Sequence, residues 1–221
     1  MPERPQSLVQ VGLPNYEVHV WSAKVDGVTD GIWMLSPEER FRAARFRFER
    51  DRVRWVSAHT LLRSVLASYL AVDPEALIFD VSPRGRPELR WPSQSGWLRF
   101  SLTHSGDISL VAVARGREVG VDVEIVRRDR DLDAIARRAL GDGPADLLDA
   151  APPEERTNGF YQAWVRHEAR GKCLGTGVIE PDREYVGPPT ETVDLELENP
   201  YMGAVAARGS VGRLRLLSPQ V

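Results

Sequence analysis

The sequence predicts an α/β protein, organised as one domain or as two small halves that share an interface. Its 221 residues suit either organisation. Several short stretches alternate apolar and polar residues as strands do, and two long stretches repeat apolar residues at the three- and four-residue spacing of a helix. With 42% hydrophobic and 28% charged residues, the composition is that of an ordinary globular protein.

Charge, cysteine content and hydropathy exclude several classes of protein. A formal charge of −3 excludes a generally basic protein that binds nucleic acid through its overall field, so an anion must be bound by local clusters. Cys173 is the single cysteine, which excludes an intramolecular disulfide and a zinc site with several thiolates. The N-terminal residues lack the apolar core of a signal peptide, and the sequence contains no apolar run long enough to span a membrane. We therefore expect a cytoplasmic protein without nucleic-acid or membrane partners.

The N-terminal third predicts one strand and two helices. After a proline-containing arm, the alternation over 16–25 indicates a strand. Ser36 can cap a helix that has Pro37 in its first position and Glu39 closing a capping box. The apolar spacing over 51–70 then predicts a long helix with one buried face. Five arginines lie on these two helices, namely Arg40, Arg42, Arg45, Arg47 and Arg54. They indicate either a solvent-exposed basic face or a binding site for an anion.

The middle of the chain predicts loops followed by three strands. The cationic segment 83–87 and the segment 91–96 are expected to be loops. Strands are expected over 98–102, 108–114 and 119–125, and the short turn at 115–118 predicts that the last two pair as a hairpin. The first of these strands leads into Thr103, His104 and Ser105. Because no nucleophile elbow surrounds the histidine, these three residues indicate a hydroxyl-lined anion site or a plain strand end.

The strand over 119–125 reads Val-Gly-Val-Asp-Val-Glu-Ile. Its apolar side chains should enter a core together, and Asp122 and Glu124 should share the opposite, exposed face. Residues two apart on a strand are roughly 6.5–7 Å apart along the backbone, so both carboxylates can reach one cation. A solvated acidic face is the alternative interpretation.

The last third predicts two helices and three strands. A helix is expected over 132–140 and a second long helix over 157–174, ended by Gly175. On the long helix Trp164, Glu168 and Lys172 are spaced by four and form one ridge, typical also of a surface ion pair. Together with the two strand carboxylates, Glu168 completes three oxygen ligands of the kind that suits Mg²⁺ bound to a substrate phosphate. The strands are expected over 192–197, 202–207 and 214–217.

At this point the sequence resembles a known family, the 4′-phosphopantetheinyl transferases of the surfactin-synthetase-activating (Sfp) type. The order and spacing of the matching residues agree over most of the chain. The helix opening at Ser36 and the basic residue Arg54 also fall at matching positions. The segments that carry the resemblance are Gly85-Arg86-Pro87, Phe100 to Ser105, Gly120 to Glu124 and Trp164 to Ala169, followed by Lys172 and Gly175.

The resemblance implies a fold of two similar α/β halves related by a pseudo-two-fold axis, with coenzyme A in the cleft between them. The expected division is residues 1–116 for the adenosine and 3′-phosphate side and 117–221 for the metal and pyrophosphate side. The implied reaction transfers 4′-phosphopantetheine from coenzyme A to a serine of an apo acyl or peptidyl carrier protein and releases 3′,5′-ADP. The resemblance also implies a monomer that depends on Mg²⁺, with Mn²⁺ as a substitute, in secondary metabolite biosynthesis.

The resemblance also assigns roles to residues. Asp122, Glu124 and Glu168 would hold the metal, Glu168 would accept the serine proton, and Lys172 would neutralise the leaving phosphate. His167 would help to place the pyrophosphate, at a position where the family usually has lysine. The expected contacts to coenzyme A are Arg42, Arg54, Arg86, Pro87, Thr103, His104, Ser105 and Lys172.

The sequence departs from the family pattern in three places. Glu39 stands where the family has a basic residue, although Arg40 adjoins it, His167 replaces a lysine, and the region from Leu140 to Pro153 lacks the phenylalanine-and-glutamate pattern of the family. Because of His167, a carrier-protein or coenzyme A binding homologue with weakened catalysis is the main alternative. A Mg²⁺-dependent nucleotide hydrolase would use the carboxylates but leaves the Thr103-His104-Ser105 segment unexplained. Between Ile125 and Leu140 arginines outnumber aspartates, which suggests that an acidic carrier docks there.

Overall fold

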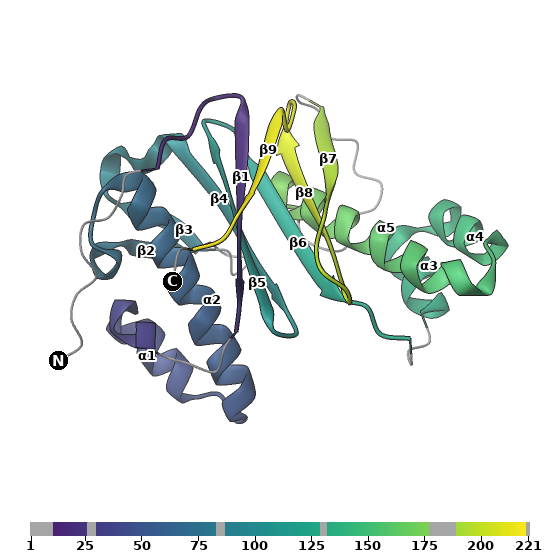
Figure 1. The fold of residues 1–221 in the computed structure, drawn as a ribbon, viewed down its shortest axis with the longest axis horizontal. Coiled ribbons are helices and arrows are strands. Elements are labelled where there is room, and N and C mark those ends of the chain that lie inside the picture. Colours follow the sequence, from purple (N-terminus) through teal and green to yellow (C-terminus); the bar gives the residue numbers. More distant parts are fainter. Residues whose placement is uncertain (1–10, 26–29, 83–86, 129–131, 177–188, 220–221) are drawn as a thin grey trace.

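The predicted α/β class is confirmed by a computed structural model, which describes residues 11–25, 30–82, 87–128, 132–176 and 189–219. Two larger sheets lie side by side (Figure 1). The first has the strand order β4-β5-β1-β9, and the second has the order β6-β8-β7. The strands of the first sheet are β1 (Glu17–Lys24), β4 (Leu98–Ser105), β5 (Ile108–Arg115) and β9 (Arg213–Leu217), and those of the second are β6 (Val119–Ile125), β7 (Thr190–Leu195) and β8 (Tyr201–Arg208).

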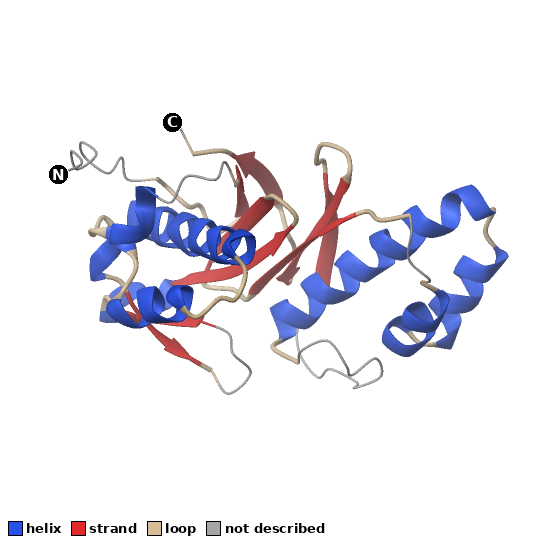
Figure 2. Ribbon diagram, turned by 90° about the horizontal axis from the view of Figure 1, so that it is seen from below, coloured by secondary structure: helices blue, strands red, loops and turns tan. Residues whose placement is uncertain are grey.

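The helices cover the outer sides of these sheets (Figures 1 and 2). Two of them, α2 (Glu49–Leu70) and α5 (Pro153–Leu174), have 22 residues each. Shorter elements surround them, and no described helix is long and apolar enough to cross a membrane. The shorter elements are α1 (Pro37–Ala44), α3 (Asp133–Leu140), α4 (Asp142–Ala150), the 3₁₀ turns η1 (Asp30–Met34), η2 (Pro74–Ala76) and η3 (Ser93–Trp97), and the hairpin β2 (Ile78–Val81) with β3 (Pro87–Trp91).

The main core lies where the two sheets face each other. Val18 and Val20 of β1 and Leu110 of β5 pack with Val121 of β6 and Val205 of β8, and all five are completely or almost completely buried. The opposite face of the first sheet packs on α2, and that of the second packs on α5. The apolar residues of β6 therefore enter a core together, as their alternation predicted.

Each half of the chain has the same topology. A strand is followed by a 22-residue helix and then by two antiparallel strands, the second of which pairs with the first strand of the half. In the N-terminal half these elements are β1, α2, β4 and β5, and in the C-terminal half they are β6, α5, β7 and β8. The C-terminal strand β9 crosses over and pairs in parallel with β1. The shared topology fits the expected likeness of the two halves, and the pseudo-two-fold axis stays a prediction.

One predicted pairing is wrong. The spacing predicted that the strands over 108–114 and 119–125 form a hairpin, but β5 pairs with β4 and β1, whereas β6 pairs with β8 in the other sheet. Gly116, with φ of +65°, turns the chain from one sheet to the next. The short connection 116–118 can join two strands of one hairpin or two strands of different sheets, and the packing of the apolar faces decides between these two arrangements. The hairpin of β2 and β3 was also not predicted.

A buried ion pair fixes α1 against α2. Ser36 caps α1, and Glu39 closes the capping box as predicted. Glu39 Oε2 also accepts hydrogen bonds from Nε and Nη2 of Arg63 at 2.8 and 2.7 Å. Arg63 is 1% exposed, and its Nη1 donates to the carbonyl oxygens of Pro74 and Leu77. One arginine of α2 therefore holds α1, η2 and the start of β2 together.

Replacing this arginine should be costly. Arg63→Met removes the counter-charge of Glu39 and the hydrogen bonds that Arg63 donates to two carbonyls, so the free energy of unfolding should fall by about 3–5 kcal/mol. Urea unfolding followed by circular dichroism measures the change. Arg52→Met is the matched control, because its partner Glu49 is 69% exposed and such pairs contribute about 0–1 kcal/mol. Equal midpoints for the Arg63 variant and the wild type would contradict this account.

Candidate active site

The site begins with an unusually close contact between α5 and β6. A Cβ atom added to Gly120 would lie 2.0 Å from the carbonyl oxygen of Ala169 and 2.5 Å from the backbone nitrogen of Cys173. Only glycine leaves room for this approach. Because α5 lies directly on β6, the side chains of Glu168 and Lys172 reach the strand residues that follow Gly120.

Asp122 is the central carboxylate. Its Oδ1 accepts hydrogen bonds from Lys172 Nζ at 2.6 Å and from Thr103 Oγ1 at 3.0 Å. Lys172 also donates to the carbonyl oxygen of Val121 at 3.2 Å. The expectation that Asp122 lies on an exposed face is wrong: it is only 5% exposed, because α5 and β4 cover that face of β6.

Two buried carboxylate oxygens have no hydrogen-bond partner in the described structure, Asp122 Oδ2 and Glu168 Oε1. Burial, together with the charge of Asp122, raises the pKa of Glu168, whereas nearby Lys172 and His167 act in the opposite direction. Within the described ranges no three His, Cys, Asp or Glu side chains form a ready metal cluster. The two unsatisfied oxygens nevertheless fit a hard divalent cation, which prefers carboxylate ligands.

Hydroxyl side chains of β4 join its edge to β6. Ser101 Oγ accepts a hydrogen bond from Val121 N at 3.2 Å, and Ser105 Oγ accepts one from Ile125 N at 3.1 Å. Ser105 Oγ also donates to Glu124 Oε2 at 2.7 Å. The structure thus directs the hydroxyl protons of Thr103 and Ser105 to the two strand carboxylates, and their contact with phosphate stays a prediction.

Two basic residues of the N-terminal half that were predicted to bind coenzyme A, His104 and Arg54, lie on β4 and α2. The pKa of His104 is lowered because packing removes water from its ring and because Lys172 and Arg54 are positively charged. Both positive charges therefore disfavour protonation of His104. Arg54 Nη2 also forms an ion pair with Asp107 at 2.7 Å.

A cavity of about 750 Å³ lies between α1, α2 and the β2-β3 hairpin. Arg42 and Pro87, two of the predicted site residues, line it, whereas Arg86 lies outside the described residues. The guanidinium of Arg42 lies over the ring of Trp55, 5.4 Å from its centroid, and the ring of His59 stacks on Trp55 with the two centroids 3.7 Å apart. His59 was missed because a single histidine on a helix gives no signal, although its four-residue spacing from Trp55 places both on one face.

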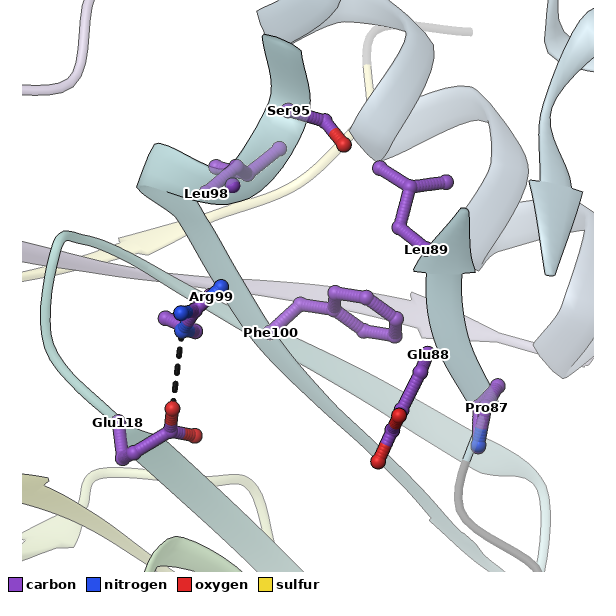
Figure 3. A pocket seen from close by; sticks show the side chains of 9 residues that line it. Pro87, Glu88, Leu89, Ser95, Leu98, Arg99, Phe100 and Glu118 are labelled. Atoms are coloured by element: carbon purple, nitrogen blue, oxygen red, sulfur yellow. Dashed lines mark ion pairs between the residues drawn. The ribbon is translucent and has the colours of Figure 1, made fainter. Parts of the chain in front are cut away.

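A second cavity, of about 320 Å³, lies near the start of β4 (Figure 3). Phe100 and Leu89 line it, and an ion pair between Arg99 Nε and Glu118 Oε1 at 2.9 Å crosses its rim. The pair connects the N-terminal sheet to the start of β6. The cavity lies toward the opposite end of β4 from Thr103 and His104.

The side chains around the Glu168 ridge point in different directions. Trp164 stacks on Phe160, with the ring centroids 6.0 Å apart, and Arg166 pairs with Asp194 of β7 through Nε at 2.7 Å. His167 is half-buried next to Glu168. Of the three residues spaced by four, only Glu168 and Lys172 therefore interact with the carboxylate of Asp122.

The basic surface expected between Ile125 and Leu140 is partly neutralised. Arg137 of α3 contacts three aspartates of α4, through Nη1 to Asp142 at 3.4 Å and Asp146 at 3.0 Å and through Nη2 to Asp149 at 2.7 Å. Its side chain thus joins α3 to α4. A carrier that docks there must compete with these aspartates for Arg137.

The described structure thus joins carboxylates of the C-terminal half to hydroxyl side chains of the N-terminal half. Comparison with known proteins gives the family. Residues 19–116 match the family model described as 4′-phosphopantetheinyl transferase, N-terminal, and residues 118–200 match that of the 4′-phosphopantetheinyl transferase superfamily. The chain belongs to this superfamily of transferases.

Curated relatives agree with this assignment. The 4′-phosphopantetheinyl transferase HetI of Nostoc sp. is 34% identical over 185 residues, which are 81% of this chain and 78% of the relative. The 4′-phosphopantetheinyl transferase psf-1 of Bacillus pumilus is 33% identical over 65% of this chain and 59% of the length of that relative. The L-aminoadipate-semialdehyde dehydrogenase-phosphopantetheinyl transferase of Xenopus laevis is 31% identical over 66% of this chain and 53% of the length of that relative. The chain thus spans little more than half of the last two relatives.

The cavity histidine should make stability depend on pH. Nδ1 of His59 donates to the carbonyl oxygen of Trp55 at 2.9 Å, and burial lowers the pKa of His59 to about 4. In the unfolded chain it takes up a proton near pH 6.5. Stability should therefore fall as the pH falls from about 6.5 to 4, because only the unfolded state binds the proton there.

Thermal unfolding of the wild type and of His59→Gln over this pH range measures the effect. The melting temperature of the wild type should fall more steeply than that of the variant, since other acidic groups contribute equally to both. Parallel curves would contradict the lowered pKa of His59.

Proposed function

We propose that the protein transfers the 4′-phosphopantetheine group of coenzyme A to a serine hydroxyl of an apo acyl or peptidyl carrier protein and releases 3′,5′-ADP. The observation that carries this proposal is the arrangement around Asp122. There Lys172 of the C-terminal half and Thr103 of the N-terminal half both donate to Asp122 Oδ1, and the charge of Asp122 acts on the buried Glu168. Phosphoryl transfer depends mostly on positioning and on charge neutralisation, which such a site supplies.

The C-terminal half, 117–221, is proposed to bind the pyrophosphate. Asp122, Glu124 and Glu168 would hold Mg²⁺ or Mn²⁺, which when bound neutralises phosphate charge and polarises the phosphoryl group. The unsatisfied oxygens of Asp122 and Glu168 support this role. Lys172, now paired with Asp122, would neutralise the leaving phosphate.

Glu168 is proposed to accept the proton of the attacking serine. A general base works best when its pKa lies near the operating pH. Burial and the charge of Asp122 raise the pKa of Glu168 toward that range. His167, on the next position of the helix, would then help to place the pyrophosphate.

The N-terminal half, 1–116, is proposed to bind the adenosine and the 3′-phosphate. The cavity lined by Arg42 and Pro87 is large enough to take part of a nucleotide. The remaining proposed contacts are Arg54, Arg86, Thr103, His104, Ser105 and Lys172. Glu39, where a basic residue was expected, is engaged with Arg63, so phosphate binding would depend on the neighbouring arginines.

A coenzyme A binding homologue without catalysis is the rival proposal, favoured only by His167 in place of lysine. The Asp122-Lys172 pair and the buried Glu168 support the transferase instead. We further propose that the protein acts as a cytoplasmic monomer of the surfactin-synthetase-activating type, in secondary metabolite biosynthesis.

Mass spectrometry of a carrier protein tests the proposed function. Incubation of an apo carrier with coenzyme A, Mg²⁺ and the protein should add one phosphopantetheine to the carrier. A binding homologue would leave the mass of the carrier unchanged. A hydrolase would consume coenzyme A without adding phosphopantetheine to the carrier.

Asp122→Asn is the informative variant, because it keeps the size of a buried side chain and removes its charge. We expect at least about 100-fold less transfer, on the scale of several kcal/mol for lost charge stabilisation, with an unchanged fold by circular dichroism. Near-normal turnover would contradict the role of Asp122.

The roles of His167 and Glu168 can be separated by kinetics. His167→Ala should lose about tenfold or less in kcat, which corresponds to one modest polar contact of ~1.4 kcal/mol. Glu168→Gln should lose roughly 100-fold or more, because it removes both the proposed base and a charge. If the His167 variant is as inactive as the Glu168 variant while it remains folded and binds coenzyme A, the base is His167.

A further inference from the structure

The turn between β4 and β5 contacts both halves of the molecule. Asp107 Oδ1 accepts hydrogen bonds from Nε and Nη2 of Arg54 at 3.1 and 2.7 Å. The backbone N–H of Asp107 donates to the hydroxyl of Tyr201 at 3.1 Å, and its carbonyl accepts from Val25 N at 2.7 Å. The first residue of β8 and the residue after β1 therefore fix the backbone that presents the carboxylate to α2.

Gly106 allows this turn to lie against the C-terminal half. Its φ is +56°, and an added Cβ would lie 2.9 Å from the hydroxyl oxygen of Tyr201. Tyr201 in turn is the partner of Ile125 in the β6-β8 ladder. Since Ser105 in the same turn donates to Glu124, one three-residue segment fixes a proposed metal ligand and holds the carboxylate that binds Arg54.

The Arg54-Asp107 pair is suited to orientation more than to stability. The side chain of Asp107 is 65% exposed, and exposed ion pairs contribute about 0–1 kcal/mol. A long arginine side chain, however, loses rotamer freedom when it binds a ligand, and holding it in place beforehand reduces that loss. Asp107 uses the Nε side of the guanidinium, so the N–H groups on the other side remain for an anion.

We propose that Asp107 is a positioning residue that directs the guanidinium of Arg54 to the 3′-phosphate of coenzyme A, and that Tyr201 holds Asp107 in place from the other half of the molecule. This inference rests on the proposed function, because it requires Arg54 to contact the 3′-phosphate. It adds two residues, one from each half, that the motifs of the sequence did not indicate.

Selectivity for the 3′-phosphate tests the inference without a carrier protein. Isothermal titration calorimetry gives the Kd of coenzyme A and of 3′-dephospho-coenzyme A, which lacks only that phosphate. In Asp107→Asn the preference for coenzyme A should fall by about three- to tenfold, the range for immobilising one long side chain, with little change for the dephospho compound. Arg54→Ala should reduce the preference at least as much, and the double variant should lose no more than Arg54→Ala.

Two further variants complete the experiment. Tyr201→Phe removes only the hydroxyl and should lower the preference by about twofold, since it loosens Asp107 without removing its charge. Glu49→Gln is the matched control: it removes the carboxylate from an exposed ion pair with Arg52 on the same helix and should change nothing.

The outcomes separate the inference from the proposed function. An unchanged or increased preference in Asp107→Asn overturns the inference, and an increase shows that Asp107 competes with phosphate for Arg54. An unchanged preference in Arg54→Ala also overturns it but leaves transfer from coenzyme A intact. A wild-type protein that binds neither compound contradicts the proposed function as well.

Discussion

The close contact of α5 with β6 is the constraint on which the site depends. At Gly120 the helix backbone occupies the space that any Cβ would need, so the 22-residue helix lies directly on the strand. This contact buries Asp122 and Glu168 and lets Lys172 reach Asp122 at 2.6 Å. Burial raises the pKa of Glu168 and leaves two carboxylate oxygens unsatisfied. The burial of these carboxylates and the raised pKa of Glu168 therefore follow from the close packing of α5 on β6.

The two halves are joined by side-chain hydrogen bonds between β4 and β6, whereas neighbouring strands of one sheet are joined by backbone hydrogen bonds. Ser101 and Ser105 of β4 accept hydrogen bonds from the backbone of β6, and Thr103 donates to Asp122. Because hydroxyl groups both donate and accept, they satisfy the edge of β6 and orient its carboxylates. At the edge between the halves, hydroxyl groups of one half therefore bind carboxylates of the other.

In the N-terminal half, the acidic residue Glu39 departs from the family pattern but fits its structural surroundings. Glu39 replaces an expected basic residue, but it closes the capping box of α1 and pairs with the buried Arg63. An acidic residue is favourable near a helix N-terminus, and the buried arginine requires a counter-charge. Glu39 thus shapes the cavity that Arg42 and Trp55 line.

The sequence by itself determined the α/β class, the capping box at Ser36, both long helices and the alternation of β6, because these depend on neighbours within a few residues. The ordered motifs also indicated a 4′-phosphopantetheinyl transferase, and the comparisons confirm that superfamily. Only the tertiary structure decided that β5 and β6 belong to different sheets, that Asp122 is buried, and that His59, Asp107 and Tyr201 adjoin the site. Each of these features depends on surfaces far apart in the chain packing together, and local spacing carries no information about which surfaces meet.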